Sequence, residues 1–150
     1  MNPSDIQRVV ENTTPRNMLS ITPHQYEIIG MGLLRRKTTV ASLPLIELGS
    51  ASTGILPFIL QLGVSYTGVD PFHADETEAV INAFLQENPS ALGKLHSAAG
   101  DGLSYLEQLP SDSATVISSG VLDSLVIGYF ISSDPLVAAY RKELSSAICK

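Results

Sequence analysis

The sequence predicts an α/β fold built around a mainly parallel β-sheet. From Leu43 onward, short apolar segments of strand length alternate with amphipathic segments of helix length. This alternation is typical of parallel sheets, because each connection between parallel strands needs a crossover, usually a helix. The chain has 150 residues, of which 44% are hydrophobic and 16% charged. It therefore has enough apolar side chains for one domain with a hydrophobic core.

Two helices are expected before the sheet begins. Ser4 followed by Gln7 fits a capping box that opens a short helix ending near Glu11. Thr22 and Pro23 start a second helix, because Thr is a favoured N-cap and Pro is favoured at the first helical position. The predicted buried stripe of this helix, which ends near Arg36, consists of Tyr26, Ile28, Ile29, Met31 and Leu33.

The rest of the chain is expected to form four strands and four helices. The strands are predicted over Leu43–Leu48, Ser65–Asp70, Leu95–Ala98 and Ala114–Ser118. The helices are predicted over Ile55–Leu62, Ala74–Gln86, Gly102–Gln108 and Pro135–Ile148. Because parallel strands end at the same edge of a sheet, we expect the residues that follow them to lie close together.

Charge and cysteine content limit the classes of function. Between Thr38 and Tyr140 there are eleven acidic residues and one basic residue, Lys94. Such an acidic segment repels a phosphate backbone, so we expect no nucleic-acid partner and favour a neutral or cationic small molecule. The single cysteine, Cys149, cannot form an internal disulfide, and no Cys–His cluster has metal-ligand spacing. With no signal peptide and no membrane-spanning segment in the sequence, we expect a cytoplasmic protein without a metal site.

The richest stretch follows the first predicted strand, where residues 47–54 read Glu-Leu-Gly-Ser-Ala-Ser-Thr-Gly. Small residues let a ligand approach the backbone closely, and ligands of parallel α/β sheets bind at the carboxyl ends of the strands. The turn therefore predicts the floor of a pocket. A plain strand–helix turn with a chance glycine has the same pattern and stays an alternative.

Two more acidic residues lie at the ends of the next two predicted strands. Asp70 ends the second strand, 23 residues after Glu47, and its carboxylate is suited to accept both hydroxyl hydrogens of a ribose. Asp101, which lies between Gly100 and Gly102, follows the third strand. Either residue alone also fits a solvated loop acid. Acids at three successive strand ends favour a site for a nucleoside-containing ligand.

In the order and spacing of these motifs, the chain from Leu43 onward resembles the class I, or Rossmann-like, methyltransferases that use S-adenosylmethionine. The resemblance implies a Rossmann-like three-layer fold in which the turn after Glu47 contacts the methionine part of the cofactor and Asp70 binds its ribose. It also implies that Phe72 packs on the adenine, that Asp101 meets its amino group and that Ser119 lies near the sulfonium. The cofactor-binding residues expected from it are Glu47, Gly49, Ser50, Ala51, Asp70, Pro71, Phe72, Asp101, Gly102 and Ser119.

The resemblance also implies a division of the chain and a reaction. Residues 1–37 form a helical lid or cap, and residues 38–150 form the cofactor-binding domain. Methyl transfer to a small molecule is expected, and in-line transfer needs positioning more than a catalytic side chain. The fourth strand lacks an Asn/Asp-Pro-Pro-aromatic element, so methylation of an adenine or glutamine amino group is not indicated. Family members continue with three more strands, so we expect truncation after the fourth strand, with the sheet edge covered by a dimer mate or partner chain.

Two other interpretations stay open. In the first, Gly49-x-Ala51-x-x-Gly54 is a variant of the dinucleotide-binding motif, and the protein is an NAD(P)-binding oxidoreductase. Glu47 argues against it, because dinucleotide-binding folds usually keep apolar residues in the first strand. In the second, the chain is a non-catalytic fragment of a methyltransferase fold that binds a ligand or a partner.

Overall fold

A four-stranded sheet with strand order β3-β2-β1-β4 forms the centre of the molecule, and all of its neighbouring strands are parallel. The computed structural model describes residues 1–13, 23–37, 42–50, 54–118 and 134–150. Its strands are β1 (Leu45–Leu48), β2 (Tyr66–Asp70), β3 (Leu95–Ala99) and β4 (Thr115–Ile117). The predicted parallel sheet is confirmed, and each strand lies within two residues of its predicted limits.

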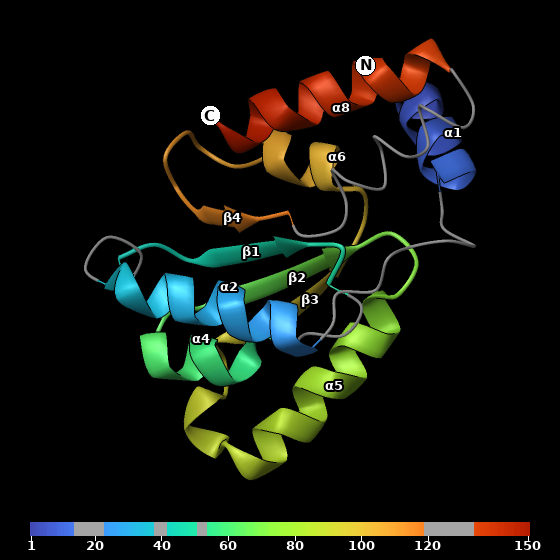
Figure 1. Ribbon diagram of the computed structural model, residues 1–150. Helices are drawn as coiled ribbons and strands as arrows, with labels where there is room; N and C mark the ends of the chain where they lie inside the picture. The colour runs from blue at the N-terminus through green and yellow to red at the C-terminus, as the bar shows by residue number, and fades with distance from the viewer. Residues whose placement is uncertain (14–22, 38–41, 51–53, 119–133) are drawn as a thin grey trace.

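Helices cover both faces of this sheet, so the molecule has three layers (Figure 1). One face carries α2 (Pro23–Arg35), α4 (Leu56–Leu62) and α5 (Ala74–Glu87), with the short 3-10 helix η1 (Pro89–Ala91) after α5. The other face carries α1 (Pro3–Thr13), α6 (Gly102–Glu107) and α8 (Pro135–Ile148). Along β1, Leu45 belongs to the first core, whereas Ile46 and Leu48 belong to the second. The predicted Rossmann-like three-layer fold is thus confirmed.

The first helix begins earlier than the sequence pattern indicated. α1 starts at Pro3, and the Oδ1 atom of Asn2 accepts a hydrogen bond of 2.9 Å from the backbone N–H of Asp5. The predicted capping box at Ser4 is therefore wrong, because Asn2 occupies the N-cap position and Pro3 the favourable first helical position. Gln7 instead donates a hydrogen bond of 2.8 Å to Glu11.

The buried side of α2 also differs from the prediction. Tyr26 and Gly30 are buried, but Ile28 is 60% exposed and Met31 is 45% exposed. The reason is the close approach of α4: a Cβ atom on Gly30 would lie 2.2 Å from Cγ of Phe58. Because Gly30 has no side chain, the helix turns this side toward α4 and leaves Ile28 and Met31 outward.

Two further findings concern only the part of the chain that the structure describes. No helix there is both long enough and apolar enough to span a membrane. No group of three or more His, Cys, Asp or Glu side chains there is arranged to hold a metal ion.

Candidate functional site

The carboxyl ends of β1, β2 and β3 bring three predicted loops together at one edge of the sheet. The N–H of Gly49, directly after β1, donates a hydrogen bond of 2.8 Å to the carbonyl of Val69 in β2. The N–H of Gly100, directly after β3, donates one of 3.3 Å to the carbonyl of Asp70. Gly49 has a φ of +77°, a left-handed conformation that favours glycine at this sharp turn. The ends of these three strands and the loops that follow them therefore form one continuous edge, with Asp70 and Asp101 on it.

Glu47 lies beneath this edge rather than on its surface. Its side chain is 0% exposed, and its Oε2 atom accepts a hydrogen bond of 2.6 Å from the hydroxyl of Tyr66. Burial raises the pKa of Glu47 above its usual value, while hydrogen bonds with Tyr66 and Tyr26 lower it in part. Glu47 thus links β1 to β2 under the turn. Its carboxylate influences a ligand by fixing the turn, or by accepting a hydrogen bond at Oε1 from the ligand or a water.

Small residues in the turn and in the neighbouring strand β2 make room for protein side chains. Ser50 is 0% exposed, and its hydroxyl lies 3.2 Å from the hydroxyl of Thr77. The Thr77 hydroxyl also donates a hydrogen bond of 3.3 Å to the backbone carbonyl of Ser50. A Cβ atom on Gly68 would lie 2.5 Å from this Ser50 hydroxyl, and one on Gly54 would lie 2.6 Å from the ring of Tyr26. The Ser50 hydroxyl is engaged in the core, so its backbone is the part left for a ligand contact.

Asp70 joins the end of β2 to the start of α5. Its Oδ1 atom accepts hydrogen bonds of 2.8 Å from the backbone N–H groups of both Phe72 and His73, and lies 3.3 Å from Nδ1 of His73. The carboxylate is therefore held in one orientation at the sheet edge. Next to it, Phe72 is 46% exposed.

Asp101 is fixed in a similar way at the start of α6. Its Oδ1 atom accepts a hydrogen bond of 2.9 Å from the N–H of Ser104, which makes Asp101 the N-cap. The hydroxyl of Tyr140 in α8 donates a second, longer bond of 3.4 Å to the same atom. Burial raises the pKa of Tyr140, and the Asp101 charge adds to this. Gly102 follows, and its backbone packs on Leu48, since a Cβ there would lie 3.1 Å from a Leu48 methyl carbon.

A pocket of about 310 Å³ lies where these groups meet α1. Pro71, Phe72 and Asp101, all predicted from the sequence, line it. Sequence reasoning missed its other lining residues, which are Ser104 and the α1 residues Pro3, Ile6, Gln7, Val10 and Glu11. The sequence analysis described this helix only by its start and end, and no local motif indicated that its side chains meet the loops after β2 and β3.

Two unpartnered oxygens mark the same edge of the sheet. Among the described residues, Glu47 Oε1 and Ser118 Oγ are the buried side-chain polar atoms without a hydrogen-bond partner. Glu47 is in β1, and Ser118 directly follows β4, its neighbour in the sheet. Buried polar atoms are nearly always hydrogen-bonded in native proteins, so each needs a partner such as a ligand or an ordered water. Two of the predicted site residues, Ala51 and Ser119, lie outside the described residues.

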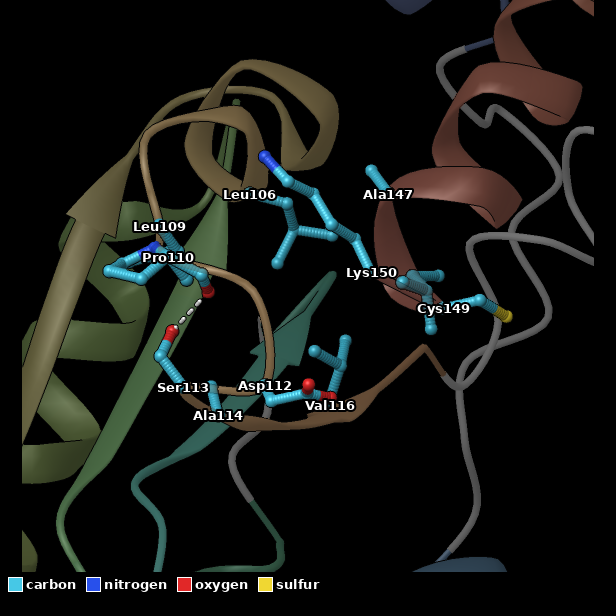
Figure 2. A pocket seen from close by; sticks show the side chains of 11 residues that line it. Leu106, Leu109, Pro110, Asp112, Ser113, Ala114, Val116, Ala147, Cys149 and Lys150 are labelled. Atoms are coloured by element: carbon cyan, nitrogen blue, oxygen red, sulfur yellow. Dashed lines mark hydrogen bonds between the residues drawn. The ribbon is translucent and has the colours of Figure 1, made fainter.

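A second pocket, of about 140 Å³, lies at the opposite edge of the sheet (Figure 2). Its lining includes Leu106 near the end of α6, Ala114 just before β4, and Ile148 at the end of α8. In Figure 2 the hydroxyl of Ser113 donates a hydrogen bond of 2.6 Å to the carbonyl of Pro110. Ligands of parallel α/β folds bind at the carboxyl ends of the strands, so the pocket at α1 is the candidate site.

Comparison with solved structures defines the class of fold. The chain shares its Rossmann-like fold with a SAM-dependent methyltransferase from Thiobacillus denitrificans, crystallised with S-adenosyl-L-homocysteine, which it matches with a TM-score of 0.50 and 21% identity. That match covers 92% of this chain and 51% of the other. YjhP from E. coli matches with a TM-score of 0.45 and 19% identity, over 87% of this chain and 50% of that one. The chain thus spans about half the length of these proteins. No family model and no curated protein matches it.

Proposed function

We propose that this chain binds S-adenosylmethionine and belongs to a methyltransferase that acts on a small molecule. The observation that carries the proposal is the grouping of Asp70, Phe72 and Asp101 at the carboxyl edge of a β3-β2-β1-β4 sheet. The solved structure from Thiobacillus denitrificans, which shares the fold, was crystallised with the demethylated form of this cofactor. The acidic charge between residues 38 and 140 supports a small, neutral or cationic methyl acceptor.

The described residues fit the chemistry of this cofactor. Asp70 uses Oδ1 for backbone hydrogen bonds, which leaves Oδ2 as the acceptor for ribose hydroxyls. The exposed ring of Phe72 offers a flat apolar surface for a nucleobase, and Asp101 offers a carboxylate at its edge. The unpartnered Oε1 of Glu47 is an acceptor for an ammonium group or a water beneath the turn. When bound, S-adenosylmethionine supplies an electrophilic methyl group on a positively charged sulfur.

The pocket is less suited to a dinucleotide. Its described lining contains the carboxylates of Glu11 and Asp101 and no lysine, arginine or histidine. In addition, the Tyr26 ring fills the space at Gly54, the last glycine of the dinucleotide-like pattern. These features favour a ligand without phosphate groups near α1.

Isothermal titration calorimetry with S-adenosylhomocysteine tests the proposal on the wild-type chain and on Asp70→Asn. The asparagine keeps an oxygen for the Phe72 and His73 amides but has only one acceptor oxygen, so we expect an affinity loss of about tenfold or more. Asp75→Asn, an exposed acid in the first turn of α5, is the charge-matched control and leaves affinity unchanged.

A separate titration with NAD distinguishes the competing cofactor. If S-adenosylhomocysteine does not bind the wild-type chain, or if NAD binds in its place, the proposed function is wrong. If Asp70→Asn binds S-adenosylhomocysteine with wild-type affinity, Asp70 does not bind the ribose.

A further inference from the structure

One face of α1 is fixed to the second core. Ile6 and Val9 are buried there, in a cluster that includes residues of α6 and α8. Arg8 pairs with Asp134 at 3.1 Å, and the N-terminal ammonium group pairs with Glu143 of α8 at 2.7 Å. The buried residues and both ion pairs hold the helix in one position on the molecule.

The adjoining side of this anchored helix lines the candidate pocket, and Ile6 belongs to both the core and the pocket wall. Gln7, Val10 and Glu11 occupy successive turns on one side of α1, and together with Phe72 and Asp101 they bound the same cavity. The N-terminal helix therefore forms one wall of the pocket, and the loops after β2 and β3 form the rest. No motif in the sequence marks this wall.

The polar groups of this wall are arranged to accept a hydrogen bond. Nε2 of Gln7 donates a hydrogen bond of 2.8 Å to Oε1 of Glu11, and among the described residues this is the hydrogen bond that the Glu11 carboxylate makes. Oε2 of Glu11 is left as an acceptor beside the pocket. A carboxylate at this position attracts an amino group and repels a carbonyl oxygen or a phosphate.

We propose that the Gln7–Glu11 face of α1 is a specificity-determining wall of the nucleoside pocket. Glu11 accepts one hydrogen of an exocyclic amino group of the base and leaves the other hydrogen to Asp101, which lines the same pocket. The inference rests on the proposed function, because it concerns the same pocket and the same ligand class. It adds that the N-terminal helix selects among nucleobases, in addition to covering the site.

The test compares two ligands that differ at a single group. S-Adenosylhomocysteine carries an exocyclic amine on its base, whereas S-inosylhomocysteine carries a carbonyl oxygen there. We expect the wild-type chain to prefer the amine-bearing ligand by about tenfold or more, since hydrogen bonds to charged groups are the stronger ones. In Glu11→Gln the new side-chain amide is able to donate a hydrogen bond to the carbonyl oxygen of S-inosylhomocysteine. The preference for S-adenosylhomocysteine therefore falls by at least about threefold.

Control variants separate the possible results. Glu78→Gln removes an exposed acid on α5 that does not line the pocket, and its preference stays at the wild-type value. Glu11 is itself exposed, so Glu11→Gln is expected to fold, which circular dichroism checks. If the wild-type chain binds neither ligand, the proposed function fails. If it binds S-adenosylhomocysteine but Glu11→Gln keeps the wild-type preference within about twofold, only the role of α1 is overturned.

Discussion

At the scale of single residues, Glu47 is the most unusual side chain of the fold. It is a carboxylic acid in the central strand β1, fully buried, with the Tyr66 hydroxyl 2.6 Å from Oε2 and no partner at Oε1 among the described residues. Burying a carboxylate costs free energy unless it is paired or protonated. Glu47 therefore connects the stability of the molecule to pH.

We predict that Glu47→Gln removes one component of the pH dependence of stability. Burial raises the pKa of Glu47 in the folded protein above its usual value of 4.5. The folded state then keeps a proton that the unfolded chain releases, so this residue's contribution to the unfolding free energy falls as the pH rises above 4.5. Urea denaturation at several pH values checks this, because wild type loses stability relative to Glu47→Gln as the pH is raised above 4.5.

Tyr66→Phe is the control for this prediction, because it strengthens the pH dependence of stability that Glu47→Gln removes. It removes the hydrogen bond that lowers the Glu47 pKa, so the loss of stability with rising pH becomes steeper. A difference between wild type and Glu47→Gln that stays constant with pH would contradict the assignment.

At the scale of elements, the contact between α2 and α4 depends on one glycine of a pair. Gly30 faces the ring of Phe58, whereas a Cβ atom on Gly32 would meet nothing within 4 Å. Both residues are in the same helix, so their intrinsic helix propensities are the same. Any difference between alanine substitutions at the two positions therefore reports packing.

We predict opposite effects of these two substitutions on the free energy of unfolding. Gly30→Ala places a methyl group 2.2 Å from Cγ of Phe58 and destabilises the fold by about 1–3 kcal/mol, the usual cost of overpacking. Gly32→Ala stabilises it by about 0.5–1 kcal/mol, because alanine is the better helix former. Urea denaturation of both variants measures this. If both changed stability in the same direction, α2 would not lie against α4 through Gly30.

The start of each helix shows how local signals compete. At α8, Asp134 accepts a hydrogen bond of 2.9 Å from the N–H of Leu136, and the predicted start of that helix is confirmed. At α1, Asn2 as N-cap and Pro3 at the first helical position set the start of the helix in place of the predicted capping box at Ser4. A capping motif is thus reliable where no better one lies within a turn of it.

At the scale of the whole molecule, the candidate pocket joins the N-terminal helix to loops from the middle of the chain. α1 supplies one wall, and loops after β2 and β3 supply the other. A ligand there contacts only the folded arrangement, because the unfolded chain does not bring these segments together. Ligand binding therefore stabilises the fold as a unit.

We predict that S-adenosylhomocysteine raises the melting temperature of the chain. At a ligand concentration of a hundred times Kd, binding to the native state adds about 2.7 kcal/mol to the unfolding free energy. Differential scanning calorimetry measures the shift, and NAD at the same concentration is the control that leaves the melting temperature unchanged. Saturation of the site without any shift would mean that the ligand binds the unfolded chain equally well.

Local patterns were enough to predict the strands, most helices and the edge at which Asp70 and Asp101 lie. Strand and helix periods are encoded in neighbouring residues, and the carboxyl ends of parallel strands necessarily share one edge. The three-layer parallel fold followed from the same alternation of elements. These features could therefore be inferred before any coordinates existed.

Tertiary packing decided which groups face the pocket and which face the core. Ser50 and Glu47 were predicted as site residues from the turn that carries them, and the structure adds that their side chains are buried against Thr77 and Tyr66. Glu11 was not expected at the site, and it lines the pocket with α1. These contacts join residues far apart in the chain, and no local pattern encodes the direction in which one element docks on another. Docking depends on close fits such as Gly30 against Phe58, which exist only once the two helices have packed against each other.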